Sequence, residues 1–256
     1  MKKTVALTIS FGASCALALM AIAGPESLPS DGKEMKQVAP APLPECDWTG
    51  FYFGVHLGGQ FGHAEDKDLD DYDVPDRPWG YPESGVIAGG QIGYNWQWHR
   101  LVLGPEFDLG YLNLDGSGVE PGSPGNNTVG KSDSDFYTTF RGRIGVNLDW
   151  HGCWLIYATG GGIGVDLETK VIDNCDTGPC GPGTIDAHES DFAWGYTVGG
   201  GLERQIGRHW SLKTEYLFYD LGDRTFSGVN SADGLNYRWR SDNQGHIIRA
   251  GLNFRF

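Results

Sequence analysis

The stretch Phe136–Leu167, which reads FYTTFRGRIGVNLDWHGCWLIYATGGGIGVDL, decides the fold. Two parts of it, Phe136–Asp149 and Cys153–Leu167, alternate so that one face of an extended chain is apolar and the other polar. Alternation with a period of two is typical of β-strands, and only Trp150–Gly152 separates the two parts. The stretch therefore predicts two long strands joined by a tight turn.

Working outward from this pair, the sequence after residue 50 contains eight such segments. They are Gly50–Gly62, Gly85–Gln97, Leu101–Leu114, Phe136–Asp149, Cys153–Leu167, Ser190–Ile206, His209–Gly222 and Gly245–Phe256. Connections of two or three residues follow the second, fourth and sixth segments, whereas connections of 21 or 22 residues follow the others. Tight turns at one rim and long loops at the other are typical of a membrane barrel. We therefore predict an all-β fold, an eight-stranded antiparallel up-and-down transmembrane β-barrel with four long loops.

The amino terminus is typical of a secretory signal peptide. Lys2 and Lys3 precede the mostly apolar Val5–Ile22, and Ala21–Ala23 has the small-x-small pattern of a cleavage site. A membrane-anchor helix is one alternative, but no basic stop-transfer cluster follows it. A lipoprotein signal at Cys15 is another, but the apolar run continues past the cysteine. We predict three parts: a signal peptide (residues 1–23), a Pro-rich periplasmic leader (24–47) and the barrel domain (48–256).

Composition excludes two classes of protein. No stretch beyond the signal approaches 18 consecutive apolar residues, which excludes spanning helices. Removing Lys2 and Lys3 takes the formal net charge from −14 to −16, and so acidic a chain is not expected to bind nucleic acid. The 40 glycines fit a barrel better than a soluble α/β enzyme.

Alternation also predicts which charged side chains face the barrel interior. It gives four acidic and four basic inward residues: Glu106, Asp108, Glu203 and Glu215 against Arg141, Arg143, Lys213 and Arg249. Eight strands leave an interior just wide enough for side chains, where charges must pair. We therefore predict a lumen ion-pair network, with Arg143 and Glu215 as a trial pair and His56 as a hydrogen-bonding neighbour. A path for ions or solutes is the alternative.

Aromatic residues gather where the two membrane interfaces are expected. Six of the nine tryptophans lie beside the amino terminus or the short turns, and they are Trp48, Trp96, Trp98, Trp150, Trp154 and Trp210. This predicts an interfacial girdle at that rim. Candidates for the girdle at the other rim are Tyr111, Phe136, Tyr137, Trp194 and Phe218.

Several motifs together carry a family resemblance. They are Trp48–Tyr52 (WTGFY), Gly89–Trp96 (GGQIGYNW), Arg141–Gly145 (RGRIG), Leu155–Gly161 (LIYATGG), Lys213–Asp220 (KTEYLFYD) and Arg249–Phe256 (RAGLNFRF). In this order and spacing the chain resembles the alphaproteobacterial porin-like outer-membrane β-barrel family, which includes major surface antigens and hemin-binding members. The resemblance implies location in the outer membrane of a Gram-negative bacterium, after signal peptide cleavage. It also implies periplasmic termini, variable surface loops and a terminal aromatic, Phe256, that serves as an assembly signal.

Four cysteines follow the signal segment. Cys175 and Cys180 bracket four residues of a long loop, and in an exported protein we expect them to form a disulfide. A metal pair is the alternative, but no nearby His/Cys set completes a tetrahedral site. Cys46 and Cys153 both lie near the turn rim, and the sequence leaves open whether they pair.

Other candidate sites are weaker. His188 and Ser190 share a strand face, as in a nucleophile–base pair of a lipid A-modifying barrel, but no orienting carboxylate is identifiable. His63 and His188 are the histidines considered for hemin. Calcium is an alternative for the aspartates between Asp66 and Asp76, although no EF-hand spacing is present.

We therefore predict a non-enzymatic outer-membrane barrel without catalytic residues, cofactor or metal. It contributes to envelope structure and surface exposure, and its partners are outer-membrane lipid, lipopolysaccharide and the barrel assembly machinery. A hemin-binding surface protein and a small porin are the alternatives, and a lipid A-modifying enzyme is the remote one. Oligomeric state is left open.

Overall fold

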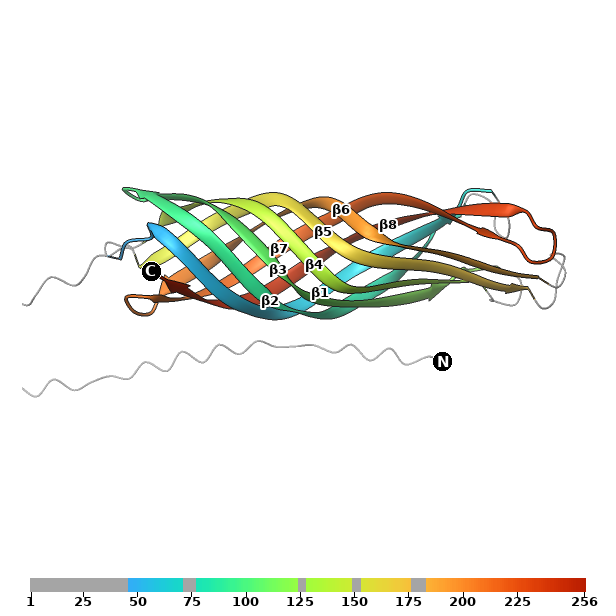
Figure 1. Cartoon of the computed structure of the whole chain (residues 1–256), viewed down its shortest axis with the longest axis horizontal. Helices are drawn as coiled ribbons and strands as arrows, with labels where there is room; N and C mark the ends of the chain where they lie inside the picture. The colour runs from blue at the N-terminus through green and yellow to red at the C-terminus, as the bar shows by residue number, and fades with distance from the viewer. Residues whose placement is uncertain (1–45, 71–76, 124–127, 149–152, 176–182) are drawn as a thin grey trace, which may run out of the picture. The chain divides into compact units, whose positions relative to one another are not determined.

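The computed structural model describes residues 46–70, 77–123, 128–148, 153–175 and 183–256, and in them the chain forms one closed antiparallel barrel (Figure 1). Each strand pairs with its neighbours in the chain, and β1 closes the barrel on β8. The strands are β1 (Gly50–Asp68), β2 (Trp79–Trp98), β3 (Leu101–Val119), β4 (Thr128–Asn147), β5 (Trp154–Cys175), β6 (Gly183–Gln205), β7 (Trp210–Val229) and β8 (Asn236–Arg255). The predicted fold class is confirmed.

At the rim with the short turns, the turn end, the strands begin and end within one or two residues of the prediction. At the opposite, extended end the prediction is wrong. There every strand continues at least five residues beyond its predicted limit, so that β1 reaches Asp68 instead of Gly62. The predicted connections of 21 or 22 residues are therefore much shorter, spanning residues 69–78, 120–127, 176–182 and 230–235.

The reason for this error is a reversal of the alternation. In the extended half, β5 points Val165, Leu167 and Val171 inward, while Asp166 is exposed on the outside. A strand with an apolar interior and a charged exterior is typical of a barrel in water rather than in lipid. A search for apolar outward residues therefore ends at the lipid boundary, although the ladder of hydrogen bonds continues.

Nearer the turn end, large apolar side chains cover the outside of the barrel. This lipid-facing band includes Phe51, Phe53, Val55, Leu57, Ile92, Leu103, Phe107, Phe140, Ile144, Val198 and Leu212, all exposed. Toward the extended end it stops at Phe61, Val86, Tyr111, Phe136, Trp194, Tyr216 and Ile248. Beyond these residues the large exposed apolar side chains of the described strands and loops are Val119, Val229 and Leu235, near the tips.

The aromatic residues only partly follow the predicted girdles. Trp96, Trp98 and Trp210 are exposed near the turn end, and Tyr111, Phe136 and Trp194 are exposed at the other boundary. Trp48 and Tyr137, in contrast, are fully buried inside the barrel. Tyr137 faces inward because it continues the alternation of Thr139 and Arg141, and the irregular register between Ser134 and Tyr137 leaves both Asp135 and Phe136 on the outside.

Among the described residues, no helix has the length and apolar character needed to cross a membrane.

Candidate functional site: the barrel lumen

The lumen contains all eight charged residues that the alternation assigned to it. Each is buried, with at most 4% of its surface exposed. The ladder places Glu106 of β3 opposite Arg141 of β4, and Glu215 of β7 opposite Arg249 of β8. The register of neighbouring strands alone thus places opposite charges next to each other, in addition to the contacts that side chains make across the barrel.

Arg141 and Arg249 form the centre of this cluster. Arg141 Nη2 lies 2.5 Å from Glu106 Oε1 and 2.6 Å from Asp108 Oδ2, and its Nη1 lies 3.2 Å from Glu215 Oε1. Arg249 Nη2 lies 2.5 Å from Glu215 Oε2 and 3.0 Å from Asp108 Oδ2. Two guanidinium groups therefore share three carboxylates that come from β3 and β7.

Arg143 and Lys213 extend the cluster toward the turn end. Arg143 Nη2 lies 2.6 Å from Glu203 Oε2, and the guanidinium carbon lies 4.2 Å from the centre of the Tyr157 ring. Lys213 Nζ lies 3.1 Å from both oxygens of Glu106. The trial pairing of Arg143 with Glu215 is wrong in the sense that Arg143 contacts Glu203 and Glu106 instead.

Neutral side chains, of which only His56 was predicted, complete the site and bond several of the remaining carboxylate oxygens, although Asp108 Oδ1 lacks a hydrogen bond of standard geometry in the described structure. Tyr52 donates a hydrogen bond to Glu106 (2.7 Å), Tyr157 to Glu215 (2.9 Å), and Ser211 to Glu203 (2.6 Å). His56 bonds Gln91 (2.7 Å) and also Tyr137. Because buried ion pairs are stable only when such partners complete them, these residues belong to the same site.

The ion-pair cluster is enclosed from both sides. Toward the extended end lies an apolar layer of Ile87, Leu112, Leu114, Tyr137, Ile163, Val165, Leu167, Ala193, Leu217, Tyr219, Leu221 and Ile247. Toward the turn end, Trp48 packs with Val102, Leu155 and Tyr157. A lumen filled in this way by charged and then apolar side chains leaves little room for a continuous column of water.

Trp48 is held in the mouth of the barrel by the short segment Cys46–Thr49, which we call the amino-terminal cap. A disulfide joins Cys46 to Cys153, with 5.0 Å between their Cα atoms, and so answers the question that the sequence left open. The Trp48 backbone donates a hydrogen bond to Gln97 Oε1 (2.8 Å), and the Arg255 guanidinium lies 5.1 Å from the centre of the Trp48 ring. Cys46 and Asp47, which the prediction assigned to a mobile leader, are therefore part of the barrel.

A second polar layer lies in the extended half, beyond the lipid-facing band. Asp66 and Glu83 are buried there, and no ion pair reaches either carboxylate from the described residues. Asn243 donates a hydrogen bond to Glu83 Oε1 (2.9 Å), whereas Glu83 Oε2 and both oxygens of Asp66 lack a hydrogen bond of standard geometry in the described structure. Burial therefore raises the pKa of Asp66 to about 6 and that of Glu83 to about 7.

These two pKa shifts predict a pH dependence between about pH 4 and 7, the range between the unfolded and folded pKa values. A carboxyl whose pKa is higher in the folded chain favours folding most below its unfolded pKa, and the stability falls as pH rises through 6 for Asp66 and 7 for Glu83. In the parent, the free energy of unfolding decreases as pH rises. We expect Glu83→Gln to make this decrease smaller by roughly 2–3 kcal/mol, and Asp66→Asn to make it smaller by a similar amount. Urea unfolding in detergent at several pH values measures it. If the free energy of unfolding changes with pH equally in the parent and in Glu83→Gln, the prediction is wrong.

The remaining sequence-predicted residues are not brought together. The predicted disulfide of Cys175 involves Cys180, which lies outside the described residues. His188 and Ser190 lie on the outside of β6, and among the described residues no hydrogen bond joins them. The nearest carboxylate to His188 is that of Asp186, 3.8 Å away and largely exposed.

His63 and the aspartates of the first long loop are likewise not brought together into a site. His63 lies on β1, separated from His188 of β6 by β7 and β8. Of the aspartates considered for calcium, Asp66 faces the lumen, whereas Asp70 pairs with Arg238 (2.7 Å), which lowers the pKa of that carboxyl. Asp68 is buried at the end of β1, and Asp71, Asp73 and Asp76 lie outside the described residues. The described residues contain no cluster of three metal-ligating side chains. Phe256 is exposed and packs its ring against Phe254.

A closed barrel of eight strands with a lipid-facing band and a filled lumen defines an integral outer-membrane protein of the small-barrel class. The sequence matches the family model described as outer membrane protein beta-barrel domain over residues 37–256, and the chain belongs to this family. It is therefore a protein of the outer membrane of a Gram-negative bacterium.

Two relatives come from alphaproteobacteria, as the resemblance implied. The 31 kDa outer-membrane immunogenic protein of Brucella melitensis is 29% identical over 84% of this chain and 87% of its own. The 22 kDa outer membrane protein of Rhizobium leguminosarum is 32% identical over 72% of each chain. Among solved structures, the outer membrane protein OprG of Pseudomonas aeruginosa superimposes with a TM-score of 0.53. It covers 84% of this chain and 100% of OprG at 13% identity, which shows a shared fold.

Proposed function

We propose that this protein is a non-enzymatic barrel with a closed lumen, which contributes to the mechanical integrity of the outer membrane and presents its extended end at the cell surface. The observation that carries the proposal is the lumen cluster, in which four acidic and four basic side chains pair within 4.0 Å of one another. The apolar layer on one side and Trp48 on the other support the same conclusion.

Orientation follows from general features of the class. In such barrels the tight turns and both chain termini face the periplasm, and the larger connections face outward. The extended end would then stand outside the cell.

Planar-bilayer recording tests the closed lumen. We expect purified protein to show no large, steady conductance, because charged and apolar side chains occupy the bore. A variant with Cys46→Ser and Cys153→Ser serves as a matched control. It removes the covalent link that holds the amino-terminal cap but leaves the ion pairs intact, so it should also stay closed. A large, stable conductance of the unmodified protein would overturn the proposal and favour a small porin.

The structure gives less support to the other functions considered. Hemin coordination by His63 and His188 together would need a ligand spanning two intervening strands. A lipid A-modifying role for His188 and Ser190 lacks a hydrogen-bonded base, and the carboxylate of Asp186 is exposed. We propose no cofactor and no catalytic residue, and Phe256 as the assembly signal.

A further inference from the structure

A pattern of charges recurs on the outside of four strands, just beyond the lipid-facing band. In β1, β4, β5 and β8 an acidic and a basic residue stand two positions apart, with one buried polar residue between them. The pairs are Glu65 with Lys67, Asp133 with Lys131, Glu168 with Lys170, and Asp242 with Arg240. The intervening residues Asp66, Ser132, Thr169 and Ser241 all face the lumen.

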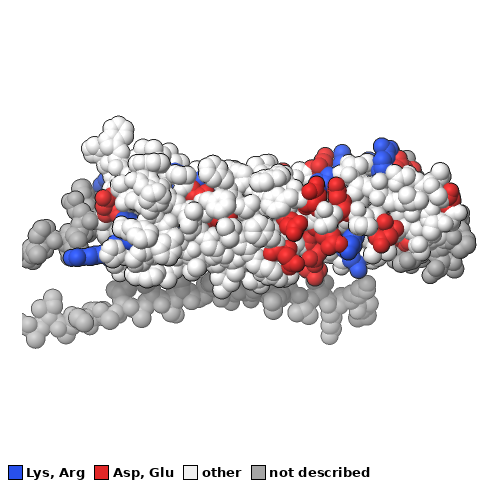
Figure 2. All heavy atoms as spheres, in the orientation of Figure 1, with Lys and Arg blue, Asp and Glu red and all other residues white. Residues whose placement is uncertain are grey.

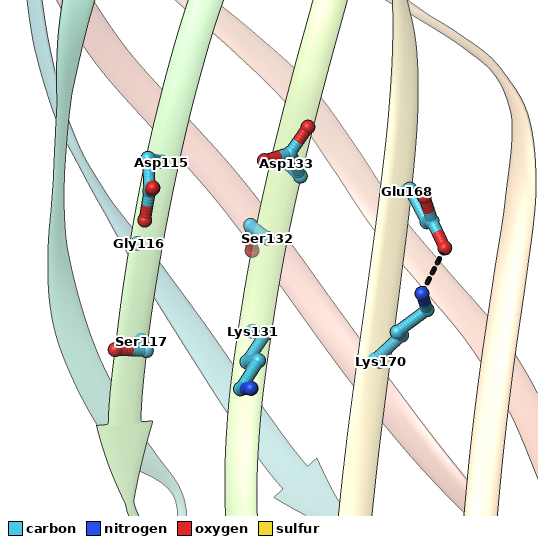
Figure 3. Close-up of a pocket in the computed structure, with 8 residues that line it drawn as sticks. All are labelled: Asp115, Gly116, Ser117, Lys131, Ser132, Asp133, Glu168 and Lys170. Carbon is cyan, nitrogen blue, oxygen red and sulfur yellow. Dashed lines mark ion pairs between the residues drawn. The ribbon is translucent and has the colours of Figure 1, made fainter.

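The register of the barrel aligns these pairs into rows. Asp115, Asp133 and Glu168 are cross-strand neighbours on β3, β4 and β5, and Ser117, Lys131 and Lys170 form the next row outward (Figure 3). On the other side of the barrel, Asp223, Asp242 and Glu65 form an acidic row on β7, β8 and β1. Arg240 and Lys67 again lie one row farther out.

The order of the two charges is set by their distance from the lipid-facing band and not by the direction of the strand. In β1 and β5, which run toward the extended end, the acidic residue comes first; in β4 and β8, which run back, the basic residue comes first. In every case the acidic residue is nearer the lipid. Figure 2 shows a group of acidic side chains on the face in view, beside the mostly uncharged middle of the barrel. If the two residues of each pair only neutralised each other, as Lys170 and Glu168 do, either of them could stand nearer the lipid.

Like charges also stand directly opposite one another in both rows. Lys131 faces Lys170, and Asp133 faces both Asp115 and Glu168. Such cross-strand pairs are destabilising in isolation. Partial burial and the neighbouring carboxylates of Asp135, Asp115 and Glu168 raise the pKa of Asp133 accordingly. A charge arrangement with this cost indicates that the rows face a charged layer outside the protein.

The height of the rows indicates which layer that is. From Phe61 to Glu65 and from Tyr111 to Asp115 the chain advances four residues beyond the last large apolar side chain. With about 3.3 Å per residue and a tilt of about 40°, the acidic row lies roughly 10 Å past the lipid boundary and the basic row roughly 5 Å farther. A phospholipid headgroup ends below the basic row, whereas the phosphorylated sugars of lipopolysaccharide extend across it.

We propose that the basic row of Lys67, Lys131, Lys170 and Arg240 docks the phosphate groups of the lipopolysaccharide sugar layer, and that the acidic row beneath it keeps those phosphates at that height. Basic clusters near a membrane surface attract anionic headgroups, and a row of carboxylates repels them. The two rows together would fix the depth of the barrel in the outer leaflet. This inference rests on the orientation stated under the proposed function.

A charge-swapped variant tests the order of the rows directly. It carries Lys131→Asp, Asp133→Lys, Glu168→Lys and Lys170→Glu, so that net charge and every acid–base neighbour pair are kept. The mature protein is refolded into phosphatidylethanolamine vesicles that contain rough lipopolysaccharide with phosphorylated core sugars. The lipopolysaccharide retained per barrel after mild extraction is then measured. We expect the swapped variant to retain about tenfold less than the parent.

Equal retention by parent and swapped variant would show that the pairs only neutralise each other and would overturn the proposal. Vesicles with phosphatidylglycerol at the same charge are the second arm; a similar loss there would assign the rows to phospholipid instead. Folding is verified by the electrophoretic shift of unboiled protein. If the swap fails to fold, Lys131→Gln with Lys170→Gln replaces it, and Arg208→Gln at the turn end is its matched control.

The orientation is tested separately. A peptide tag inserted at Pro121 should be labelled on intact cells. If the tag becomes accessible only after the envelope is opened, the rows face the periplasm, and both the proposed orientation and this inference fail. If the tag is exposed but the swap has no effect, only this inference fails.

Discussion

Arg141→Ala is expected to lower the free energy of unfolding of the barrel by about 3–5 kcal/mol. Arg141 is fully buried and contacts Glu106, Asp108 and Glu215, so its removal leaves three carboxylates short of a partner in a low-dielectric interior. The alanine also leaves a cavity in the lumen. Urea unfolding in lipid vesicles measures the change. Arg208→Ala, at an exposed turn, is the control and should change stability by less than about 0.5 kcal/mol.

A double-mutant cycle then separates direct from indirect partners. Arg143→Ala and Glu203→Gln should show a coupling energy on the order of 1–3 kcal/mol, because the two side chains are in contact. Arg143→Ala and Glu215→Gln should couple more weakly, since the described structure shows no direct ion pair between them. Stronger coupling of Arg143 to Glu215 than to Glu203 would contradict the geometry of the cluster. A loss below about 1 kcal/mol for Arg141→Ala would contradict the ion-pair account altogether.

Removal of the disulfide with Cys46→Ser and Cys153→Ser should cost about 2–5 kcal/mol. The bond closes a loop across a sequence separation of 107 residues, and in the chain-entropy model a long loop gives a large restriction of the unfolded chain. Without it the amino-terminal cap is held by non-covalent contacts, including the packing of Trp48 and the hydrogen bonds that join the cap to Gln97 and Gln205.

The same unfolding experiment with and without a reductant provides the control. In a background that carries Cys175→Ser and Cys180→Ser, reductant should shift the parent to the unfolding midpoint of the double serine variant and leave that variant unchanged. A parent that is insensitive to reductant, while the serine variant is destabilised, would attribute the loss to the substitutions rather than to the bond.

The turn end and the lumen charges could be predicted from sequence for the same physical reason. In lipid, every second side chain must be apolar, so alternation reveals both the strand and its inward residues. Arg141, Arg143 and Arg249 stand out because a charge within an apolar alternation has only one acceptable side. The partner of Arg143 could not be predicted, because Glu203 lies on β6, which does not pair with β4, whereas Arg141 and Arg249 each meet an acidic residue opposite them on a neighbouring strand.

The extended half could not be predicted in this way. Glu83 and Asp66 lie in segments whose outward residues are polar, so no apolar alternation marks them as strands. The position of Trp48 was missed because a tryptophan near a turn fits an interfacial girdle equally well. The pairing of Cys46 with Cys153 could not be predicted, because Cys153 precedes β5, which lies four strands from β1 in the closed barrel, so that the cap reaches it only by crossing the mouth.

The reversal of the alternation between the two halves means that two solvents act on every strand. A slip of β7 by one residue against β8 would move Lys213 and Glu215 into the hydrocarbon, and at the same time it would turn Leu221 and Phe226 of the extended half toward water. Hydrocarbon penalises the first half of such a misaligned hairpin, and water penalises the second. Correct alignment of a strand therefore has to meet two independent conditions, one in the hydrocarbon half and one in the aqueous half. A hairpin that meets only one of these conditions does not close into the barrel.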